Sequence, residues 1–336
     1  MSVEPFAPFA PFAPPKVLGN AHVQSLLTSS GWRRRYIQRR AQNYLQRSRA
    51  KVWRADDGSR LLAWHTQAVR PAEQTSRGVV ILLHGWEGSG DSNYLLSCAV
   101  TLDRAGFDTV RLNLRDHGPS HHLNVDLFHS CRLYEVLDVV GQLVGHHALV
   151  PVHLVGFSLG GNFTLRVARS APAHGYRLQR AVAVCPVIRP SKVLDALERG
   201  PALYQTYFVR KWRRSLRTKQ ALFPEQYQFG EWLKLRGLRD QTAYLIEHFT
   251  EYPDLDTYLA GYAVAEDYLA DLDIETLIIT AEDDTIIPIA DFDDVAPSPA
   301  LTIERVPRGG HCGFLSDWRM HSWVDRRIVS ALGGPA

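Results

Sequence analysis

The sequence contains few cysteines, and none lies where a metal or redox site would need it. The 336 residues include only Cys98, Cys131, Cys185 and Cys312, without a C-x-x-C pair. Isolated thiols of this kind usually behave as small buried apolar residues and suit a reducing compartment. The histidine pairs at 121–122 and 146–147 lie in polar loops without a matching carboxylate, so we expect no metal site.

Long apolar runs are also absent. No window approaches the roughly 18 uninterrupted apolar residues that a membrane span requires. Three Phe-Ala-Pro units over residues 6–14 interrupt the continuous apolar stretch that a secretory signal needs. We therefore expect a cytoplasmic protein whose first 20 residues are extended, either lying on the body or loose.

The overall charge gives no sign of a nucleic-acid partner, because the formal net charge is only +3. The distribution is uneven, however. Residues 1–60 carry eleven Lys and Arg against three acidic residues, and a second basic run spans residues 210–214. Such runs are usually solvated helix faces. The alternative is a peripheral contact with an anionic membrane surface, where each basic residue adds roughly 1 kcal/mol.

Strand-like and helix-like segments alternate along most of the chain. Short apolar, β-branched runs occur at residues 79–83, 109–114, 150–155, 181–187, 276–280 and 301–306, with helical patterns between several of them. This alternation predicts an α/β fold with a mostly parallel sheet and helices on both faces. Upstream, Asp56-Asp57-Gly58 between two apolar runs predicts a hairpin over residues 51–66.

One connection is too long to be a single crossover helix. The 88 residues between Val187 and Thr276 contain helix-like runs at 194–198, 203–216, 242–249 and 255–270, and no clear strand. Because long unstructured loops are uncommon inside a domain, we expect a helical cap over residues 189–271. The core would then comprise residues 51–188 and 272–336. Residues 1–50 would form a Pro-rich, basic and helical extension that packs on the body.

The segment Gly156-Phe157-Ser158-Leu159-Gly160 matches G-x-S-x-G. It directly follows an apolar strand pattern and precedes a helical one, which is the setting of a nucleophile elbow. Glycine on both sides permits a turn so sharp that larger side chains would collide. The pattern predicts Ser158 as an exposed nucleophile at a helix N-terminus; the alternative is an ordinary helix N-cap.

A second motif, His84-Gly85-Trp86, follows the first long apolar strand. Acyl transfer builds negative charge on a carbonyl oxygen, and two rigidly held backbone donors lower that barrier. We expect these oxyanion-hole donors to be the N–H groups of Trp86 and Leu159. His84 itself is a possible general base, but a histidine at a strand end more often stiffens the loop by hydrogen bonding.

Candidates for an acid and a base follow the last two strands. Glu282, Asp283 and Asp284 compete as the acid, and a position four residues before Pro288 favours Asp284, with Asp283 second. We expect the other two to be solvated loop carboxylates. His311, flanked by glycines, is the predicted base, and its distance from Asp284 leaves room for one helix and one strand. A Ser158–His311–Asp284 triad is therefore predicted.

Taken in order, these motifs resemble the YheT-like branch of the α/β-hydrolase superfamily, which includes embryogenesis-associated relatives. The matching segments are Pro15 with residues 19–25, then residues 84–89, 113–118, 156–162, 283–284 and 309–314. The resemblance implies an α/β-hydrolase fold, the same triad and hydrolysis of short- to medium-chain acyl esters, with acylglycerols and phospholipids as candidate substrates. The acyl-transfer cycle itself needs no cofactor. The Phe-Ala-Pro leader and Thr285, where relatives often carry proline, depart from the pattern.

The predicted reaction is hydrolysis of a small carboxylic ester through an acyl-enzyme. The same residues would serve an amide, peptide or thioester substrate, or a peroxide in place of water. A non-catalytic ligand-binding protein on this fold is an alternative of a different class.

In the predicted cap, apolar residues at helical spacing over 203–216 either pack the cap onto the sheet or form the wall of an acyl-chain tunnel.

Overall fold

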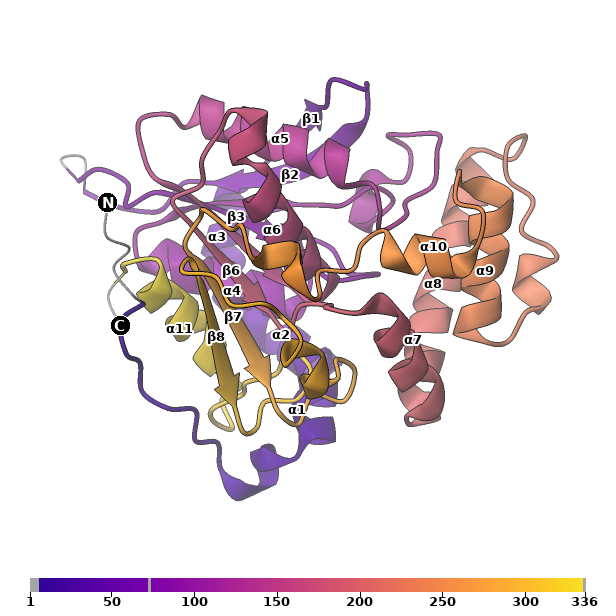
Figure 1. The fold of residues 1–336 in the computed structure, drawn as a ribbon. Coiled ribbons are helices and arrows are strands. Elements are labelled where there is room, and N and C mark those ends of the chain that lie inside the picture. Colours follow the sequence, from indigo (N-terminus) through magenta and orange to yellow (C-terminus); the bar gives the residue numbers. More distant parts are fainter. Residues whose placement is uncertain (1–5, 72–73, 335–336) are drawn as a thin grey trace.

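The centre of the protein is an eight-stranded sheet, seen in a computed structural model that describes residues 6–71 and 74–334 (Figure 1). The strands are β1 (Arg49–Arg54), β2 (Arg60–Thr66), β3 (Val79–Leu83), β4 (Asp108–Leu112), β5 (Val152–Phe157), β6 (Arg180–Val184), β7 (Thr276–Ala281) and β8 (Leu301–Val306). Their order is β1-β2-β4-β3-β5-β6-β7-β8. β2 is antiparallel to both its neighbours, and all other pairs are parallel. The predicted mostly parallel sheet and its leading hairpin are confirmed.

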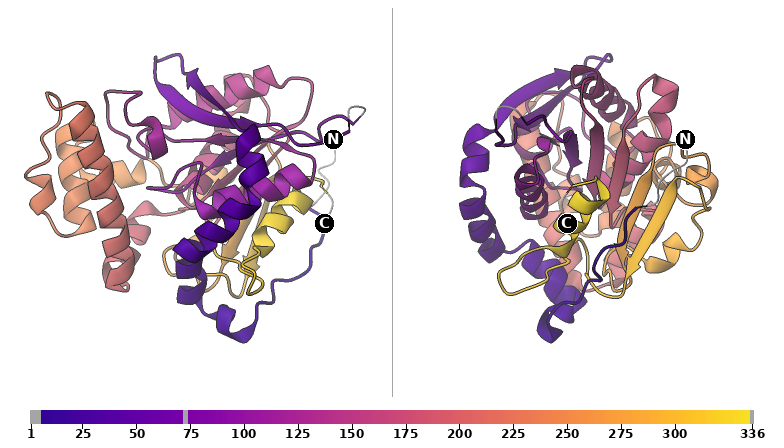
Figure 2. Two further views of the ribbon diagram at one scale, coloured as in Figure 1. Left: turned by 180° about the vertical axis from the view of Figure 1, so that it is seen from behind. Right: turned by 90° about the vertical axis from the view of Figure 1, so that its left-hand side faces the viewer.

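Helices cover both faces of this sheet (Figure 2). α5 (Leu133–His146) and α6 (Leu159–Ser170) pack on one face, and α4 (Asn93–Arg104) and α11 (Trp323–Ala331) pack on the other. Every side chain of β3, β5 and β7 is buried. Burial on two faces explains why these strands are mostly apolar and show no regular polar alternation. Short 3-10 turns η2 (Gly118–Ser120), η3 (Pro172–His174) and η6 (Ile289–Phe292) lie in the connections.

The N-terminal residues pack against the same face as α4 and α11. They form η1 (Lys16–Gly19), α1 (Ala21–Thr28), α2 (Gly31–Arg40) and α3 (Gln42–Arg47). The Pro-rich leader lies on the body: Phe12 packs against Phe314 and Trp323, and the Trp323 indole N–H donates to the Ala10 carbonyl at 2.7 Å. On α2 several arginines are exposed beside Trp32, whereas Arg33 is fully buried.

Between β6 and β7 the chain leaves the sheet and forms a group of helices at one end of it (Figure 1). They are α7 (Pro190–Arg199), α8 (Ala202–Leu222), η4 (Trp232–Lys234), α9 (Leu238–Phe249) and α10 (Leu255–Ala260). The helical insertion is confirmed, while the boundaries of the predicted domains stay a prediction. The predicted helix over 255–270 is wrong beyond Ala260. After Gly261 the chain is irregular up to η5 (Asp267–Leu269), and the apolar spacing continues through Val264 in irregular backbone and Leu269 in the short 3-10 turn, both buried.

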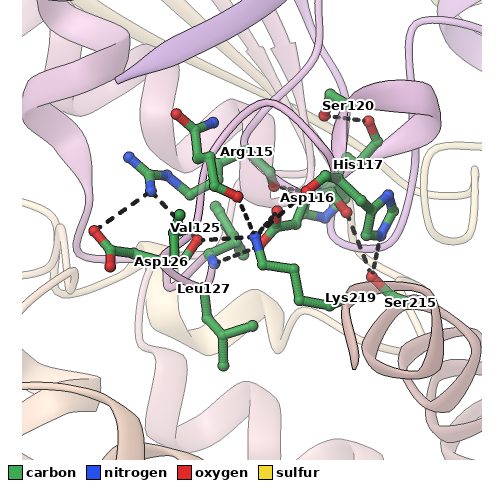
Figure 3. Close-up of polar contacts among 12 residues, drawn as sticks. Arg115, Asp116, His117, Ser120, Val125, Asp126, Leu127, Ser215 and Lys219 are labelled. Carbon is green, nitrogen blue, oxygen red and sulfur yellow. Dashed lines mark hydrogen bonds and ion pairs between the residues drawn. The ribbon is translucent and has the colours of Figure 1, made fainter. Parts of the chain in front are cut away.

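A buried lysine fastens α8 to the core (Figure 3). Lys219 Nζ donates to Asp116 Oδ1 at 2.7 Å and to the carbonyl oxygens of Asn124 and Asp126 at 2.8 and 3.1 Å. The Lys219 side chain is 1% exposed and that of Asp116 7%. One turn earlier on the helix, the Ser215 hydroxyl lies 2.8 Å from His121 Nε2. The insertion is thus tied to the loop after β4 by a desolvated ion pair and its surrounding carbonyls.

None of the helices within residues 6–71 and 74–334 combines the length and the apolar character needed to cross a membrane.

Candidate active site

The predicted site residues follow the carboxyl ends of parallel strands, which meet at one edge of the sheet. His84 comes after β3, Ser158 after β5, Asp284 after β7 and His311 after β8. The architecture therefore collects residues that are far apart in sequence at the edge where α/β proteins place their ligands.

Ser158 occupies a sharp turn between β5 and α6. Its backbone has φ 55° and ψ −118°, a conformation that a residue with a side chain rarely adopts. Its N–H donates to the Val184 carbonyl of β6 at 2.8 Å, which holds the turn in place. A Cβ on Gly156 would lie 2.0 Å from the Gly160 carbonyl oxygen, and one on Gly160 would lie 2.4 Å from that of Leu83. Only glycine fits at these two positions: the turn itself requires Gly156, and the close approach of the end of β3 requires Gly160.

The structure brings the three predicted residues of the triad together. His311 Nε2 lies 2.9 Å from Ser158 Oγ, and His311 Nδ1 lies 2.9 Å from Asp284 Oδ2. The Asp284 side chain is fully buried, and that of His311 is 12% exposed. Because an ionised carboxylate only accepts hydrogen bonds, the ring proton belongs on Nδ1, and Nε2 can accept the proton of the serine hydroxyl.

The electrostatic surroundings favour a charged His311. Burial of the ring opposes its protonation. The nearby negative charge of Asp284 favours protonation more strongly, and Cys312 acts in the same direction. The net effect raises the pKa of His311 well above 6.5. Asp284 is itself held by the backbone N–H groups of Ile286 and Ile287, which donate to its Oδ1 at 2.8 and 3.0 Å.

The two competing acids have different positions. Glu282 is exposed, as expected of a solvated carboxylate. The same expectation for Asp283 is wrong, because its Oδ1 accepts a hydrogen bond from the Gly310 N–H at 2.8 Å. Partial burial raises the pKa of Asp283. Asp283 therefore ties the loop after β7 to the loop that carries His311, while Asp284 is the acid of the three that is hydrogen-bonded to the ring.

The loop after β3 lies directly beside Ser158. A Cβ on Gly85 would be 3.1 Å from Ser158 Cβ, and the Gly85 N–H donates to the Tyr94 hydroxyl at 2.9 Å. Within the described part of the chain, no hydrogen bond joins the N–H of Trp86 or of Leu159 to another residue. Leu159 is the first residue of α6, so its N–H lies at the positive end of the helix dipole.

Two buried histidines stiffen this loop. His84 Nε2 accepts from the Leu114 N–H at 3.1 Å, which leaves Nδ1–H to donate to the Gly85 carbonyl at 2.7 Å. Burial lowers the pKa of His84 to about 4, so the ring stays neutral. This geometry favours the loop-stiffening interpretation of His84 over a general base. His117 accepts from the Glu87 N–H at 3.1 Å in the same manner. Sequence reasoning assigned His117 no role, although it lies in one of the motifs that carried the resemblance.

Aromatic residues of α8 cover the same loop. The Trp86 ring stacks on Phe208 with 5.4 Å between centroids and meets Trp212 edge-on at 5.1 Å. A cavity of about 50 Å³ lies between the helices α8 and α9 and the core. It is lined by Glu87 and His117 on the core side and by Trp212 on the side of α8. Burial raises the pKa of Glu87 to about 8, so this carboxyl is largely protonated at neutral pH. A hollow of about 630 Å³ beside α5 shares no residue with the predicted site.

Two thiols lie behind the His311 ring. Within residues 6–71 and 74–334, Cys185, His311 and Cys312 are the one group whose possible metal-ligating atoms gather, all within 4.8 Å of one another. Both nitrogens of the ring already contact Ser158 and Asp284, so a metal ion here would compete with those contacts. All four cysteines are free thiols, and Cys98, Cys185 and Cys312 are buried.

Comparison with known proteins identifies the family. A sequence profile for the alpha/beta hydrolase fold matches residues 78–317, and no curated protein gives a significant match. The esterase Pf2001 of Pyrococcus furiosus is similar in structure (TM-score 0.56, 13% identity, 87% of this chain and 94% of the esterase). So are a 2,6-dihydroxy-pseudo-oxynicotine hydrolase (0.57, 15%, 88% and 72%) and a variant of the monoglyceride lipase of Saccharomyces cerevisiae (0.53, 16%, 85% and 94%). At these identities the likeness shows a shared fold. Because the profile spans most of the sequence, the chain belongs to the α/β-hydrolase-fold family.

Proposed function

We propose that the protein is a serine hydrolase that cleaves carboxylic esters of short- to medium-chain acids, in the YheT-like branch of its family. Ser158 is the nucleophile, His311 the general base and Asp284 the acid that orients the base. The observation that carries this proposal is the continuous chain of contacts from Ser158 Oγ through the imidazole to the buried Asp284 carboxylate, with 2.9 Å at both steps.

The proposed cycle passes through an acyl-enzyme. His311 Nε2 takes the Ser158 proton as Oγ attacks the ester carbonyl, and Asp284 stabilises the resulting imidazolium. The N–H groups of Trp86 and Leu159 donate to the oxyanion. Collapse of the tetrahedral intermediate expels the alcohol, which His311 protonates. A water molecule, deprotonated by His311, then hydrolyses the acyl-enzyme. The cycle requires no cofactor.

The ester assignment is tested with matched substrates. We expect a fluorophosphonate to label Ser158 and a p-nitrophenyl ester to be hydrolysed faster than the amide and the thioester of the same acid. A series of acyl chain lengths on the same enzyme then defines the preferred acid. Faster turnover of the amide or thioester would move the proposal to that acyl bond. A folded protein that resists labelling would instead support a ligand-binding role.

The raised pKa of His311 predicts an alkaline shift in activity. The base must be neutral to accept the serine proton, so kcat/KM should rise with pH and level off only above the His311 pKa, with a midpoint above 6.5. In Asp284→Asn the favourable negative charge is removed while burial remains, so the midpoint should move to lower pH. The pH dependence of the fluorophosphonate labelling rate measures both midpoints. An unchanged or higher midpoint in the variant would contradict this electrostatic account.

A further inference from the structure

The loop that carries His311 is held by α1, a helix near the start of the chain. The Ser25 hydroxyl accepts a hydrogen bond from the His311 backbone N–H at 2.9 Å and donates its own proton to the Ala21 carbonyl at 2.8 Å. Because the hydroxyl proton is committed within α1, the oxygen presents its lone pairs to the histidine. Ser25 thus contacts the backbone of the residue that the proposed function makes the general base.

Gln24 holds the other end of the same loop. Its side chain is fully buried, and its amide makes two hydrogen bonds with the backbone of Leu315. Oε1 accepts from the Leu315 N–H at 2.7 Å, and Nε2 donates to the Leu315 carbonyl at 3.1 Å. Nε2 also donates to the Leu18 carbonyl at 2.5 Å, which links the loop to η1. One side chain therefore satisfies both backbone groups of a residue that lies outside any strand or helix.

The loop itself needs such support. Cys312 and Phe314 both have positive φ values, of 56° and 48°, and such strained non-glycine residues persist only where surrounding contacts hold them. Two of the three glycines in the loop allow α1 to approach closely. A Cβ on Gly310 would lie 2.4 Å from the Ala21 carbonyl oxygen, and one on Gly313 would lie 2.8 Å from Gln24 Oε1. The loop and α1 are complementary in shape as well as in hydrogen bonding.

We infer that Gln24 and Ser25 are positioning residues, which hold the His311 ring between Ser158 and Asp284. This inference rests on the proposed function. The helix also reaches the insertion, since His22 Nδ1 lies 2.9 Å from the Tyr204 hydroxyl of α8. α1 therefore connects the base loop to the helices that cover the oxyanion loop. In this arrangement the N-terminal extension is part of the catalytic apparatus, although it touches no reacting atom.

Ser25→Ala tests the inference. Loss of the acceptor frees the His311 backbone, and small displacements of a catalytic group are costly, so we expect kcat for a p-nitrophenyl ester to fall about 10- to 100-fold with KM nearly unchanged. The downfield proton resonance of the His311 Nδ1–H should broaden in the variant. Ser29→Ala is the matched control: Ser29 is exposed on the same segment, and its hydroxyl makes no hydrogen bond within the described chain.

Gln24→Glu provides a second variant. It keeps the size of the side chain and one acceptor oxygen, but places a carboxylate oxygen against the Leu18 and Leu315 carbonyls, so kcat should fall at least as much as in Ser25→Ala. Titration with a fluorophosphonate counts the active molecules in each sample. The inference is overturned if Ser25→Ala keeps the wild-type kcat, or if the active fraction shrinks while each active molecule turns over normally. Absence of labelling in the wild type would instead overturn the proposed function.

Discussion

Replacing Ser158 by alanine is expected to lower kcat for ester hydrolysis by about six orders of magnitude and to abolish fluorophosphonate labelling. The reason is chemical: alanine retains the turn but offers no oxygen to the carbonyl carbon. Because the side chain packs beside Gly85 without supporting it by a hydrogen bond, thermal unfolding should be nearly unchanged. Ser170→Ala, at the far end of α6, is the control and should keep full activity.

The same kcat measurement distinguishes the roles of the two adjacent aspartates, Asp283 and Asp284. Asp284→Asn should lower kcat by about 10⁴-fold, because an amide can present the wrong atom to Nδ1 and cannot stabilise the imidazolium. Asp283→Asn retains an acceptor for the Gly310 N–H and should cost far less. Equal losses in the two variants, or labelling that persists in Ser158→Ala, would contradict the proposed roles.

Replacing Lys219 by methionine is expected to lower the free energy of unfolding by about 3–5 kcal/mol. The change removes the ion-pair partner of the buried Asp116 carboxylate and the donor to the Asn124 carbonyl, while the Asp126 carbonyl keeps a hydrogen bond from Arg115 at 3.3 Å. Burial already raises the pKa of Asp116, which indicates how poorly this site tolerates an isolated charge. Urea denaturation monitored by tryptophan fluorescence measures the loss.

Lys234→Met is the matched control for this stability measurement. Lys234 forms an exposed ion pair with Glu231, with side chains 71% and 69% accessible, and such pairs contribute about 0–1 kcal/mol. Combining Lys219→Met with Asp116→Asn should recover part of the loss, since the buried charge is then removed. Equal stability of the two lysine variants would show that the internal ion pair does not hold α8.

Much of the fold and the site could be predicted because local patterns encode them. The mostly apolar sequences of β3 and β5 follow from burial on two faces. Gly156 follows from a turn without room for a Cβ, and Gly160 from the close approach of the end of β3. The glycines around His311 were recognised for the freedom they give the loop. The contact that excludes a side chain at Gly310 and Gly313 is the close approach of α1, which the sequence of the loop alone does not reveal.

The contributions of the N-terminal extension could not be predicted in this way. Ser25 and His311 are 286 positions apart, and a single hydrogen bond between distant residues leaves no periodicity in the sequence. The basic run in α2 suggested a solvated face, yet Arg33 within it is buried completely. In the insertion, apolar spacing persisted past Ala260 because irregular backbone can bury side chains as well as a helix can. Sequence patterns predict helices and strands, whereas the long-range contacts between them are known only from the tertiary structure.

α8 is restrained near both of its ends, by Tyr204 against α1 and by Lys219 against the loop after β4. A helix held near both ends keeps a fixed position over the loop after β3. We expect this restraint to keep the Phe208 and Trp212 side chains packed on Trp86 throughout turnover, so that the rate depends little on solvent viscosity.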